Sequence, residues 1–373
     1  MGTMDIADLD RLLIALGEFD GSDLHIKAGA PPRMRIAGAL RTVEGEPDFT
    51  AEETEAIAES MMTESVRQTF AERHEADFAY SIPGTGRFRV NAYYQRSSAA
   101  LAIRRVRATP ATADELGLPS VVTELAQQMR GLVLVTGPTG SGKTTTLAAM
   151  IDYINHFRSC HIVTIEDPVE VLHRDDLAAI DQREVGFDTE SFNSAMRVVL
   201  RQDPDVILVG EMRDQETVAA ALGAAETGHL VFSTLHTINA TETINRIVDF
   251  FPPHQQSQIR LSLAGSLHGI VCQRLIPTVD GDGRVPVLEV LVINGRIQQA
   301  IVDPLLTGDI EGIVADGAYY GMVTFDESLA TLIASGRISL AEAMATASNP
   351  HDLKVLLERQ GILQTGSFAA QLG

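Results

Sequence analysis

Residues 131–144 read Gly131-Leu-Val-Leu-Val-Thr-Gly137-Pro-Thr-Gly140-Ser-Gly142-Lys143-Thr144, and this stretch decides the fold. Its apolar residues 132–135 predict a short buried strand, and the apolar positions after the loop recur at the spacing of a helix. The loop between them fits the pattern G-x-x-x-x-G-K-[ST] from residue 137 to residue 144. Because a strand precedes the loop and a helix follows it, the stretch predicts a nucleoside triphosphate site, in preference to an incidental glycine-rich turn.

The residue types in this loop suit the binding of phosphate. Glycines let several backbone N–H groups point into one concavity, and the start of the helix adds a field that favours anions. Lys143 brings a positive charge for the β- and γ-phosphates, and the hydroxyl of Thr144 is a ligand for Mg²⁺. The residues predicted to bind the nucleotide are Gly137, Pro138, Thr139, Gly140, Ser141, Gly142, Lys143, Thr144 and Thr145.

Composition excludes several classes of protein. The net charge of −21 disfavours a surface built to bind phosphate backbones, so no nucleic acid is expected as a partner. The chain has no apolar run long enough for a transmembrane helix and begins with an acidic segment, so we expect a cytoplasmic protein. Cys160 and Cys272 lie far apart, which fits a reducing compartment and excludes a four-cysteine zinc site.

The first part of the chain predicts a small α+β domain over residues 1–108. Apolar spacing predicts a helix at 4–16, and alternation predicts half-buried strands around Leu24 and Met34. A capping box at Thr50 predicts a helix over 51–61. Residues 87–94 and 99–106 predict a hairpin, and the chain then reaches a linker, predicted at 109–116.

The rest of the chain, residues 117–373, predicts an α/β domain. Apolar runs alternate with helical patterns, which is typical of a parallel sheet covered by helices. After about residue 255 the pattern predicts a helical region that extends to residue 373. The predicted strands are 132–136, 161–165, 206–209 and 229–234.

Three polar motifs flank these strands. Glu166 and Glu211 each come just after an apolar run, where a nucleotide-hydrolysing core needs carboxylates for a metal ion and for the attacking water. His229 and His236 stand at either end of the last predicted strand. Taken singly, each carboxylate is better explained as a solvated loop residue, and each histidine is equally well explained as a strand-end residue bonded to the backbone. The order and spacing behind a phosphate loop favour the catalytic interpretation for the carboxylates.

Together these motifs resemble those of the type II and type IV secretion ATPases, most closely the PilT-type motors of pilus retraction and twitching motility. Residues 137–144 resemble the Walker A loop, 164–168 the Asp box, 205–214 the Walker B region and 228–236 the His box. Ser22-Asp-Leu-His-Ile and residues 320–329 resemble the two ends of the family pattern, so the resemblance covers nearly the whole chain.

The resemblance implies an N-terminal PAS-like domain, a RecA-like P-loop ATPase core and a homohexameric ring that hydrolyses ATP with Mg²⁺. It implies that Glu166 is the general base, that Glu211 supports the metal and water, and that His229 belongs to the catalytic set. Arg89 and Arg104 match the N-terminal arginines of the family and are expected near the γ-phosphate. The alternative for each arginine is an exposed strand residue, and the functional interpretation is favoured over it.

The expected function is the retraction of a type IV pilus, with an inner-membrane platform protein and a paralogous ATPase as partners and peripheral membrane association. The alternatives are an assembly or type II secretion motor, and an accessory ATP-binding ring that modulates a paralogous motor. The chain lacks the longer N-terminal region and four-cysteine insertion usual in assembly motors. Residues 295–301 depart from the A-I-R-N-L-I-R-E signature that PilT proteins often carry.

Overall fold

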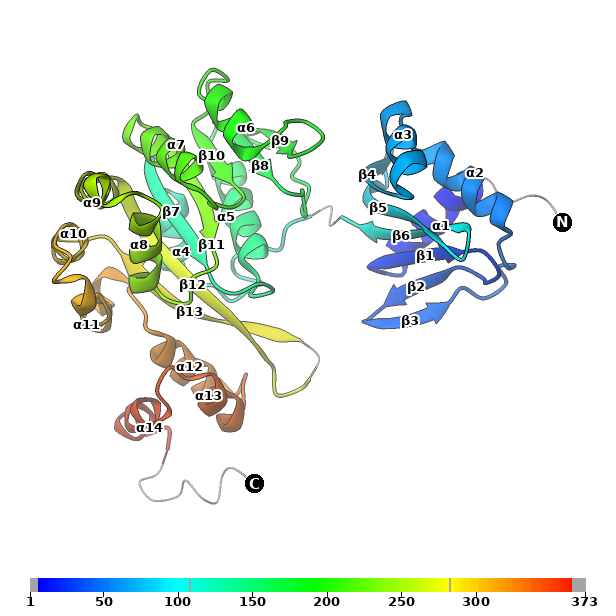
Figure 1. Cartoon of the computed structure of the whole chain (residues 1–373). Helices are drawn as coiled ribbons and strands as arrows, with labels where there is room; N and C mark the ends of the chain where they lie inside the picture. Colours follow the sequence, from blue (N-terminus) through cyan, green and yellow to red (C-terminus); the bar gives the residue numbers. More distant parts are fainter. Residues whose placement is uncertain (1–5, 107–108, 282, 364–373) are drawn as a thin grey trace. The chain divides into compact units, whose positions relative to one another are not determined.

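The computed structural model describes residues 6–106, 109–281 and 283–363. The chain forms two compact units, one of residues 1–109 with 170–172 and one of residues 110–169 with 173–373. Figure 1 labels the helices and strands of both units. No helix in the described ranges combines the length and the apolar character needed to cross a bilayer.

The N-terminal unit is a six-stranded antiparallel sheet with helices packed on one face (Figure 1). The strand order is β3-β2-β1-β6-β5-β4. The predicted helices and the predicted hairpin are confirmed, whereas α3, β3 and β4 were not predicted. The elements are α1 (Ile6–Glu18), β1 (Asp23–Lys27), β2 (Arg33–Ile36), β3 (Ala39–Thr42), α2 (Ala51–Met61), α3 (Glu64–Arg73), β4 (Glu75–Ile82), β5 (Gly86–Gln95) and β6 (Ser98–Arg105).

Alternation along the strands gives this sheet one apolar and one polar face. On β5, Phe88 and Val90 are buried with α1 and α2 in one core, while Arg89 lies on the opposite face of the strand. The helix α2 begins at Thr50, whose hydroxyl accepts from the N–H of Glu53, so the predicted capping box is confirmed.

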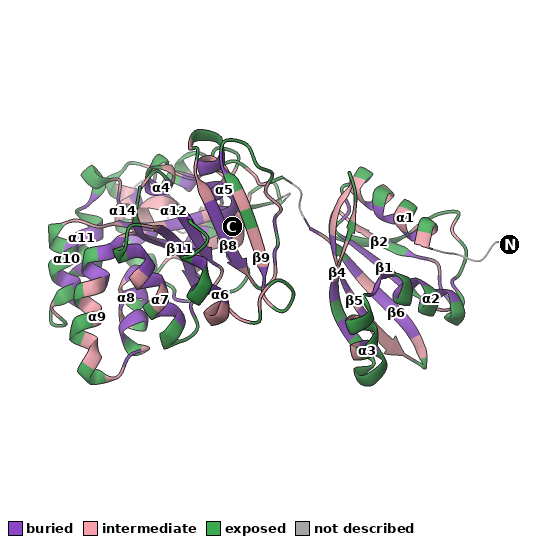
Figure 2. Cartoon of the chain, turned by 90° about the horizontal axis from the view of Figure 1, so that it is seen from above, coloured by how far each residue is buried: buried purple, intermediate pink, exposed green. Residues whose placement is uncertain are grey.

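The larger unit is a seven-stranded sheet covered by helices on both faces. Its strand order is β13-β12-β7-β11-β10-β8-β9, and its neighbours are parallel except for the antiparallel pair β12–β13. Successive residues of β7 enter the cores on opposite faces, as Leu132 and Val133 show, and the sheet is buried throughout its centre (Figure 2). The sheet elements are β7 (Gly131–Thr136), β8 (His161–Glu166), β9 (Ala179–Glu184), β10 (Val206–Val209), β11 (Leu230–Leu235), β12 (Leu267–Pro277) and β13 (Arg284–Val292).

The helices of this unit form two groups, those between strands and those that follow β13. The first group is α4 (Ser120–Ala126), α5 (Lys143–Phe157), α6 (Phe192–Val199), α7 (Gln215–Glu226), α8 (Ala240–Asp249) and α9 (Pro253–Ser266). The second group is α10 (Gly295–Val302), α11 (Ile310–Ala315), α12 (Phe325–Ala334), α13 (Leu340–Thr346) and α14 (Pro350–Arg359). The predicted capping box at Thr324 is present at the start of α12.

The prediction that residues 255–373 are helical is wrong for β12 and β13. These strands add a long antiparallel hairpin to the sheet next to β7. The centre of β12, including Ile270, Val271 and Cys272, is fully buried, so its sequence lacks the alternation that marks a half-exposed strand. The overall fold class, an α/β core with a small α+β domain, is confirmed.

Candidate active site

The phosphate loop joins β7 to α5 and is shaped by its glycines. Gly137 and Gly142 have φ angles of +144° and +88°, which side chains other than glycine rarely adopt. A Cβ on Gly137 would come within 2.2 Å of the carbonyl oxygen of Gln273, and a Cβ on Gly142 within 2.7 Å of its Nε2. A side chain at Gly137 would therefore collide with the backbone of β12, and one at Gly142 would displace the amide of Gln273.

The start of α5 presents N–H groups and positive charge together. The first helical bond is donated by the N–H of Thr146 to Gly142, so the N–H groups of residues 142–145 precede the helical ladder. The Nζ atom of Lys143 lies 2.8 Å from the carbonyl oxygen of Gly137 and 3.2 Å from that of Pro138. Residues 142–145 are half-buried, as an anion site that is open to ligand requires.

The loop also fits the phosphates and the Mg²⁺ ion that the motif implies. The hydroxyl oxygen of Ser141 is buried and has no hydrogen-bond partner in the described part of the chain, so it offers an unsatisfied polar group within the loop. The hydroxyl of Thr144 stands in the first turn of α5, next to Lys143. The predicted nucleotide-binding residues from Gly137 to Thr145 thus lie together in one loop and one helix turn.

Glu166 ends β8, and its carboxylate is held by two neutral donors. The hydroxyl of Thr164 donates to Oε1 at 2.6 Å, and the Nε2 of Gln182 donates to the same oxygen at 3.1 Å. Thr164 is buried and is paired across the sheet with Gln182 on β9. The orientation of the Glu166 carboxylate is therefore set by the pairing of β8 with β9.

Glu211 follows β10 and is held by two cationic or potentially cationic side chains. Nη2 of Arg213 lies 2.9 Å from Oε2, and Nε2 of His236 lies 3.0 Å from Oε1. Burial by itself raises the pKa of Glu211, but the hydrogen bond from Arg213 and the charges of His236 and Arg213 outweigh it and lower the pKa. Glu211 is therefore a carboxylate that stays ionised at neutral pH.

The sheet brings these groups to one edge. The strands β7, β11, β10 and β8 are consecutive and parallel, so the residues that follow them meet at their shared carboxyl end. Hydrogen bonds tie the segment after β10 to both of its neighbours, from the N–H of Gly210 to Ile165 and from the N–H of Met212 to Thr234. The phosphate loop, His236, Glu211 and Glu166 consequently lie in that order along one sheet edge.

Comparisons with known proteins agree with this geometry. The family model of the type II/IV secretion system protein matches residues 15–353. This chain belongs to that family. It is 41% identical over 351 residues to the type IV pilus ATPase PilU of Pseudomonas aeruginosa, over 94% of this chain and 91% of the relative. It is 42% identical over 345 residues to the type IV pilus retraction ATPase PilT of the same organism, over 92% of this chain and 99% of the relative.

A solved structure of the pilus retraction motor PilT with bound ADP has the same fold. It matches with a TM-score of 0.85 and 45% identity, over 94% of this chain and 99% of the other. The protein is accordingly an ATP hydrolase of the PilT/PilU group of type IV pilus ATPases. The family resemblance and the enzyme class predicted from the sequence are confirmed.

His229 lies at the end of β11 opposite the phosphate loop. His229 precedes β11, and its carbonyl accepts from the N–H of Gly131 at the start of β7. The six residues of β11 separate it by about 20 Å from the edge that carries the phosphate loop. Its Nδ1 lies 3.0 Å from the carbonyl oxygen of Ala224. Within one chain, His229 is a strand-end histidine bonded to the backbone, and His236 is the histidine at the site.

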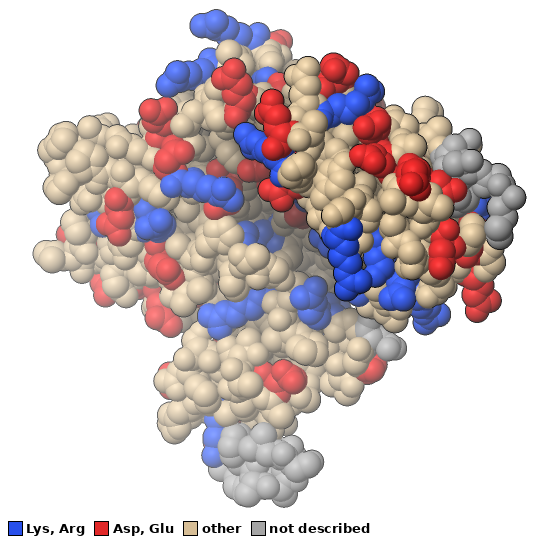
Figure 3. All heavy atoms as spheres, turned by 45° about the vertical axis from the view of Figure 1, so that its right-hand side comes forward, with Lys and Arg blue, Asp and Glu red and all other residues tan. Residues whose placement is uncertain are grey.

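The predicted arginines of this ATPase lie together in the N-terminal unit. Arg89 on β5 and Arg104 on β6 are directly paired across the sheet, on the face opposite the helices. The next strand places Asp23 beside Arg104, with Arg104 Nε 2.8 Å from Asp23 Oδ1. Asp23 also pairs with Arg35 on β2, so one carboxylate lies between two arginines and Arg89 continues the row beyond Arg104. Basic side chains gather on part of the N-terminal unit in Figure 3.

Two glutamines at the site were not predicted. Gln182 holds Glu166 from β9, and Gln273 contacts the phosphate loop from β12. Neither strand was expected, because β9 is largely polar and β12 lies in the region predicted as helical. Neither glutamine belongs to a sequence motif. Their places at the site depend on which strands are neighbours in the sheet, and no local stretch of the sequence encodes that order.

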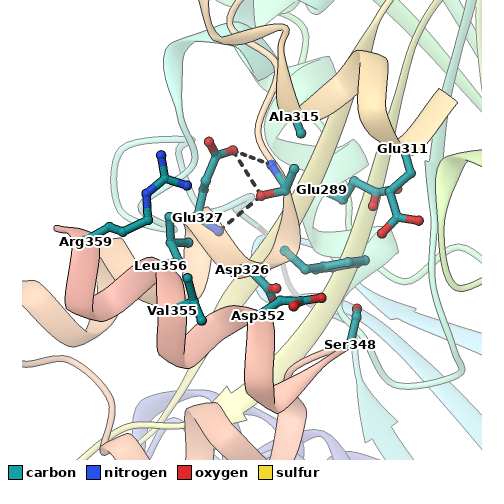
Figure 4. A pocket seen from close by; sticks show the side chains of 12 residues that line it. Glu289, Glu311, Ala315, Asp326, Glu327, Ser348, Asp352, Val355, Leu356 and Arg359 are labelled. Atoms are coloured by element: carbon teal, nitrogen blue, oxygen red, sulfur yellow. Dashed lines mark hydrogen bonds between the residues drawn. The ribbon is translucent and has the colours of Figure 1, made fainter. Parts of the chain in front are cut away.

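A second hollow of this ATPase, about 370 Å³, lies among β13, α11, α12 and α14. Five of its twelve lining residues are acidic, and Figure 4 shows carboxylates from all these elements with Arg359 at one side. Burial raises the pKa of Glu289, whose Oε1 accepts from the N–H of Ala240, and burial with the charges of Asp352 and Glu311 raises the pKa of Asp326. Such a lining repels phosphate, so the hollow is not a second nucleotide site.

Proposed function

We propose that this protein is a homohexameric, Mg²⁺-dependent ATPase motor that powers the retraction and disassembly of type IV pili. The observation that carries the proposal is the meeting of the phosphate loop, Glu166 and Glu211 at one edge of the parallel sheet. The 42% identity to the retraction ATPase PilT, over almost the full length of both chains, supports the direction of the motor.

The surroundings of the two carboxylates support different roles for them. In the proposed reaction a water oxygen attacks the γ-phosphorus, the bond to the bridging oxygen of ADP breaks, and Glu166 accepts a proton of the water. Glu166 suits this role because the hydroxyl of Thr164 and the amide of Gln182 both donate to its Oε1 and so fix the orientation of the carboxylate. Glu211 is kept ionised by Arg213 and His236, which suits a carboxylate that acts on the metal side.

The remaining loop residues bind the phosphates. Lys143 and the N–H groups of residues 142–145 hold the β- and γ-phosphates in this proposal. Thr144 and, through water, Glu211 would hold Mg²⁺, which when bound supplies positive charge at the phosphate oxygens. The ADP bound to the PilT relative supports nucleotide binding by this chain.

The N-terminal unit couples hydrolysis to movement in this proposal. Arg89 and Arg104 approach the γ-phosphate and stabilise the charge that develops there, a contribution worth roughly 10³–10⁵ in rate in other nucleotide hydrolases. Because both arginines belong to a separate compact unit, their approach and withdrawal link the chemical step to domain motion. A hexameric ring turns that motion into work on a partner.

The proposed partner is the inner-membrane platform protein at the pilus base, with a paralogous pilus ATPase as a further partner. The protein acts from the cytoplasmic side and associates with the membrane peripherally. The test is a gene deletion complemented with the parent or with Glu166→Gln. Excess pili that do not retract, restored to normal by the parent only, support a retraction motor. Cells without pili would instead identify an assembly motor.

A second candidate function is an accessory ATP-binding ring that modulates a paralogous motor. The observation that favours it is α10, where residues 295–302 form a helix with Arg296 exposed and Ile297 buried but without the signature typical of PilT. The 41% identity to PilU is close to the identity to PilT. An ATPase assay of the purified protein separates the two, because a motor turns over alone and an accessory ring needs its partner.

A further inference from the structure

The side chain of Gln273 bridges two parts of the phosphate-binding unit from a neighbouring strand. Its Nε2 donates to the carbonyl oxygen of Ser141 in the loop at 2.7 Å. Its Oε1 accepts from the hydroxyl of Thr146 in the first turn of α5, also at 2.7 Å. Gln273 therefore joins the end of the loop to the beginning of the helix.

The bridge is shielded from water. Gln273 and Ser141 are each 3% exposed, and Thr146 is 1% exposed. β12 is paired with β7, and Cys272 is opposite Thr136, the last residue before the loop. The register of two sheet strands thus places the Gln273 amide, and a buried amide with satisfied partners holds its neighbours in one geometry.

The glycines of the loop make room for this residue. The missing side chain of Gly142 leaves space for the Gln273 amide nitrogen, and that of Gly137 leaves space for the Gln273 carbonyl oxygen. Both glycines are therefore needed for contact with β12 as well as for their positive φ angles. The loop is shaped on one side by its own sequence and on the other by Gln273.

Loss of the amide leaves two buried polar groups without partners. The carbonyl oxygen of Ser141 and the hydroxyl of Thr146 cannot reach water in place of Gln273, since both residues are buried. The loop then relieves the cost by shifting, which moves the N–H groups of residues 142–145 that face the phosphates. Loss of the Gln273 amide therefore weakens the binding of phosphate, although Gln273 itself does not contact the nucleotide.

We propose that Gln273 is a positioning residue that fixes the shape of the phosphate loop for nucleotide binding. The inference rests on the proposed function, in that it takes residues 137–145 as the nucleotide site. Because the loop serves ADP and ATP alike, Gln273 contributes equally to the binding of both, and affects KM more than kcat.

The test uses the full-length protein and two substitutions. One removes the amide of Gln273, and the other removes the hydroxyl of Thr146 that the amide contacts. Gln273→Met keeps the length of the side chain and removes the amide, and Thr146→Val removes only the hydroxyl. Thr146→Ser keeps the hydroxyl and serves as the rescue variant. Gln256→Met is the control, because the amide of the half-buried Gln256 also donates to a carbonyl, that of Phe251, which lies outside the phosphate loop. Affinity for a fluorescent ADP analogue, KM and kcat for ATP, and thermal stability are measured for each.

We expect Gln273→Met to weaken binding of the ADP analogue and to raise KM by roughly tenfold, with kcat changed less than about threefold. Thr146→Val should weaken binding by about threefold to fivefold, and Thr146→Ser and Gln256→Met should bind like the parent. If Gln273→Met does not fold, Thr146→Val against Thr146→Ser gives the same comparison. Unchanged affinity in both bridge variants, or a fall in kcat with unchanged affinity, overturns the proposal.

Lys143→Ala separates this inference from the proposed function. Loss of ADP binding in Lys143→Ala together with unchanged binding in Gln273→Met overturns only the role of Gln273. Full ADP binding in Lys143→Ala overturns the assignment of the nucleotide site, and the role of Gln273 with it.

Discussion

Oε1 of Glu211 lies 3.0 Å from Nε2 of His236, while its Oε2 lies 2.9 Å from Nη2 of Arg213. The carboxylate is therefore held at both oxygens by residues that follow two neighbouring parallel strands, β10 and β11. This arrangement keeps an ionised carboxylate at the carboxyl edge of the sheet and supports the proposed role of Glu211 on the metal side of the site.

We expect Glu211→Gln to raise the Mg²⁺ concentration needed for half-maximal ATPase activity by about tenfold or more, because the amide lacks the charge that a Mg²⁺ site uses. Metal-free binding of ADP should change little. The measurement is a Mg²⁺ titration of ATPase activity, with Glu216→Gln as control, since Glu216 is an exposed glutamate paired with Arg197 on α6. Equal Mg²⁺ dependence in parent and Glu211→Gln contradicts the assignment.

Arg213→Gln should make the site sensitive to mild acid. A carboxyl group whose pKa is lowered by folding stabilises the folded state at pH values above its ordinary pKa. This stabilisation is lost as the pH falls through the lower pKa of the folded state. In the parent, Glu211 therefore protonates only below its ordinary value of 4.5. Removal of the Arg213 hydrogen bond and charge raises the pKa of Glu211, because only His236 then opposes the effect of burial.

The measurement is Mg²⁺-dependent activity of the parent and Arg213→Gln between pH 5 and pH 8. As the pH is lowered, Arg213→Gln should lose activity at a higher pH than the parent does. Toward pH 8 the activities of the two proteins should become equal. If activity falls at the same acidic pH in both proteins, Arg213 does not keep Glu211 ionised.

Thr164→Val should slow hydrolysis without weakening binding. Valine fits the buried strand position of Thr164 but cannot donate to Oε1 of Glu166, so one of the bonds that orient the proposed base is lost. A lost hydrogen bond of about 1 kcal/mol corresponds to a fall in kcat of roughly fivefold. KM and kcat of Thr164→Val and of Thr164→Ser, which keeps the hydroxyl, give the comparison. A rise in KM with unchanged kcat would point to a structural role only.

Arg89→Gln and Arg104→Gln should each lower kcat by at least about 10² while ADP binding remains close to that of the parent. The reason is that a charge placed at the γ-phosphate acts on the transition state and not on ADP. Arg33→Gln is the control, because Arg33 is an exposed arginine on the same face of the same sheet. If all three variants have the kcat of the parent, the arginine pair is a surface feature of the N-terminal unit.

Much of the core of this ATPase is encoded in short stretches of sequence. Residues 137–144 specify a turn, an anion site and a helix start by themselves, and the carboxylates Glu166 and Glu211 follow buried strands that apolar runs reveal. The position of such residues at one sheet edge follows from a parallel arrangement alone. For these reasons the phosphate loop and both carboxylates could be predicted before the structure was known.

Other parts of the site depend on which strands become neighbours. His229 and His236 bound the same strand, and only the direction of β11 relative to β7 decides which of them reaches the phosphate loop. Gln182 and Gln273 come from the polar strand β9 and the buried strand β12, whose sequences resemble a loop and a helical region. Their partners are set by pairing across the sheet, so no local pattern could predict them.

The measurement that tests the central claim most directly is the steady-state Mg²⁺-dependent ATPase rate of the purified protein beside Glu166→Gln, with ATP occupancy matched by direct binding. The account predicts turnover by the parent alone and a fall of about 10²–10⁴ in the variant with ATP binding retained. Turnover by Glu166→Gln at the rate of the parent, at equal ATP occupancy, would contradict it.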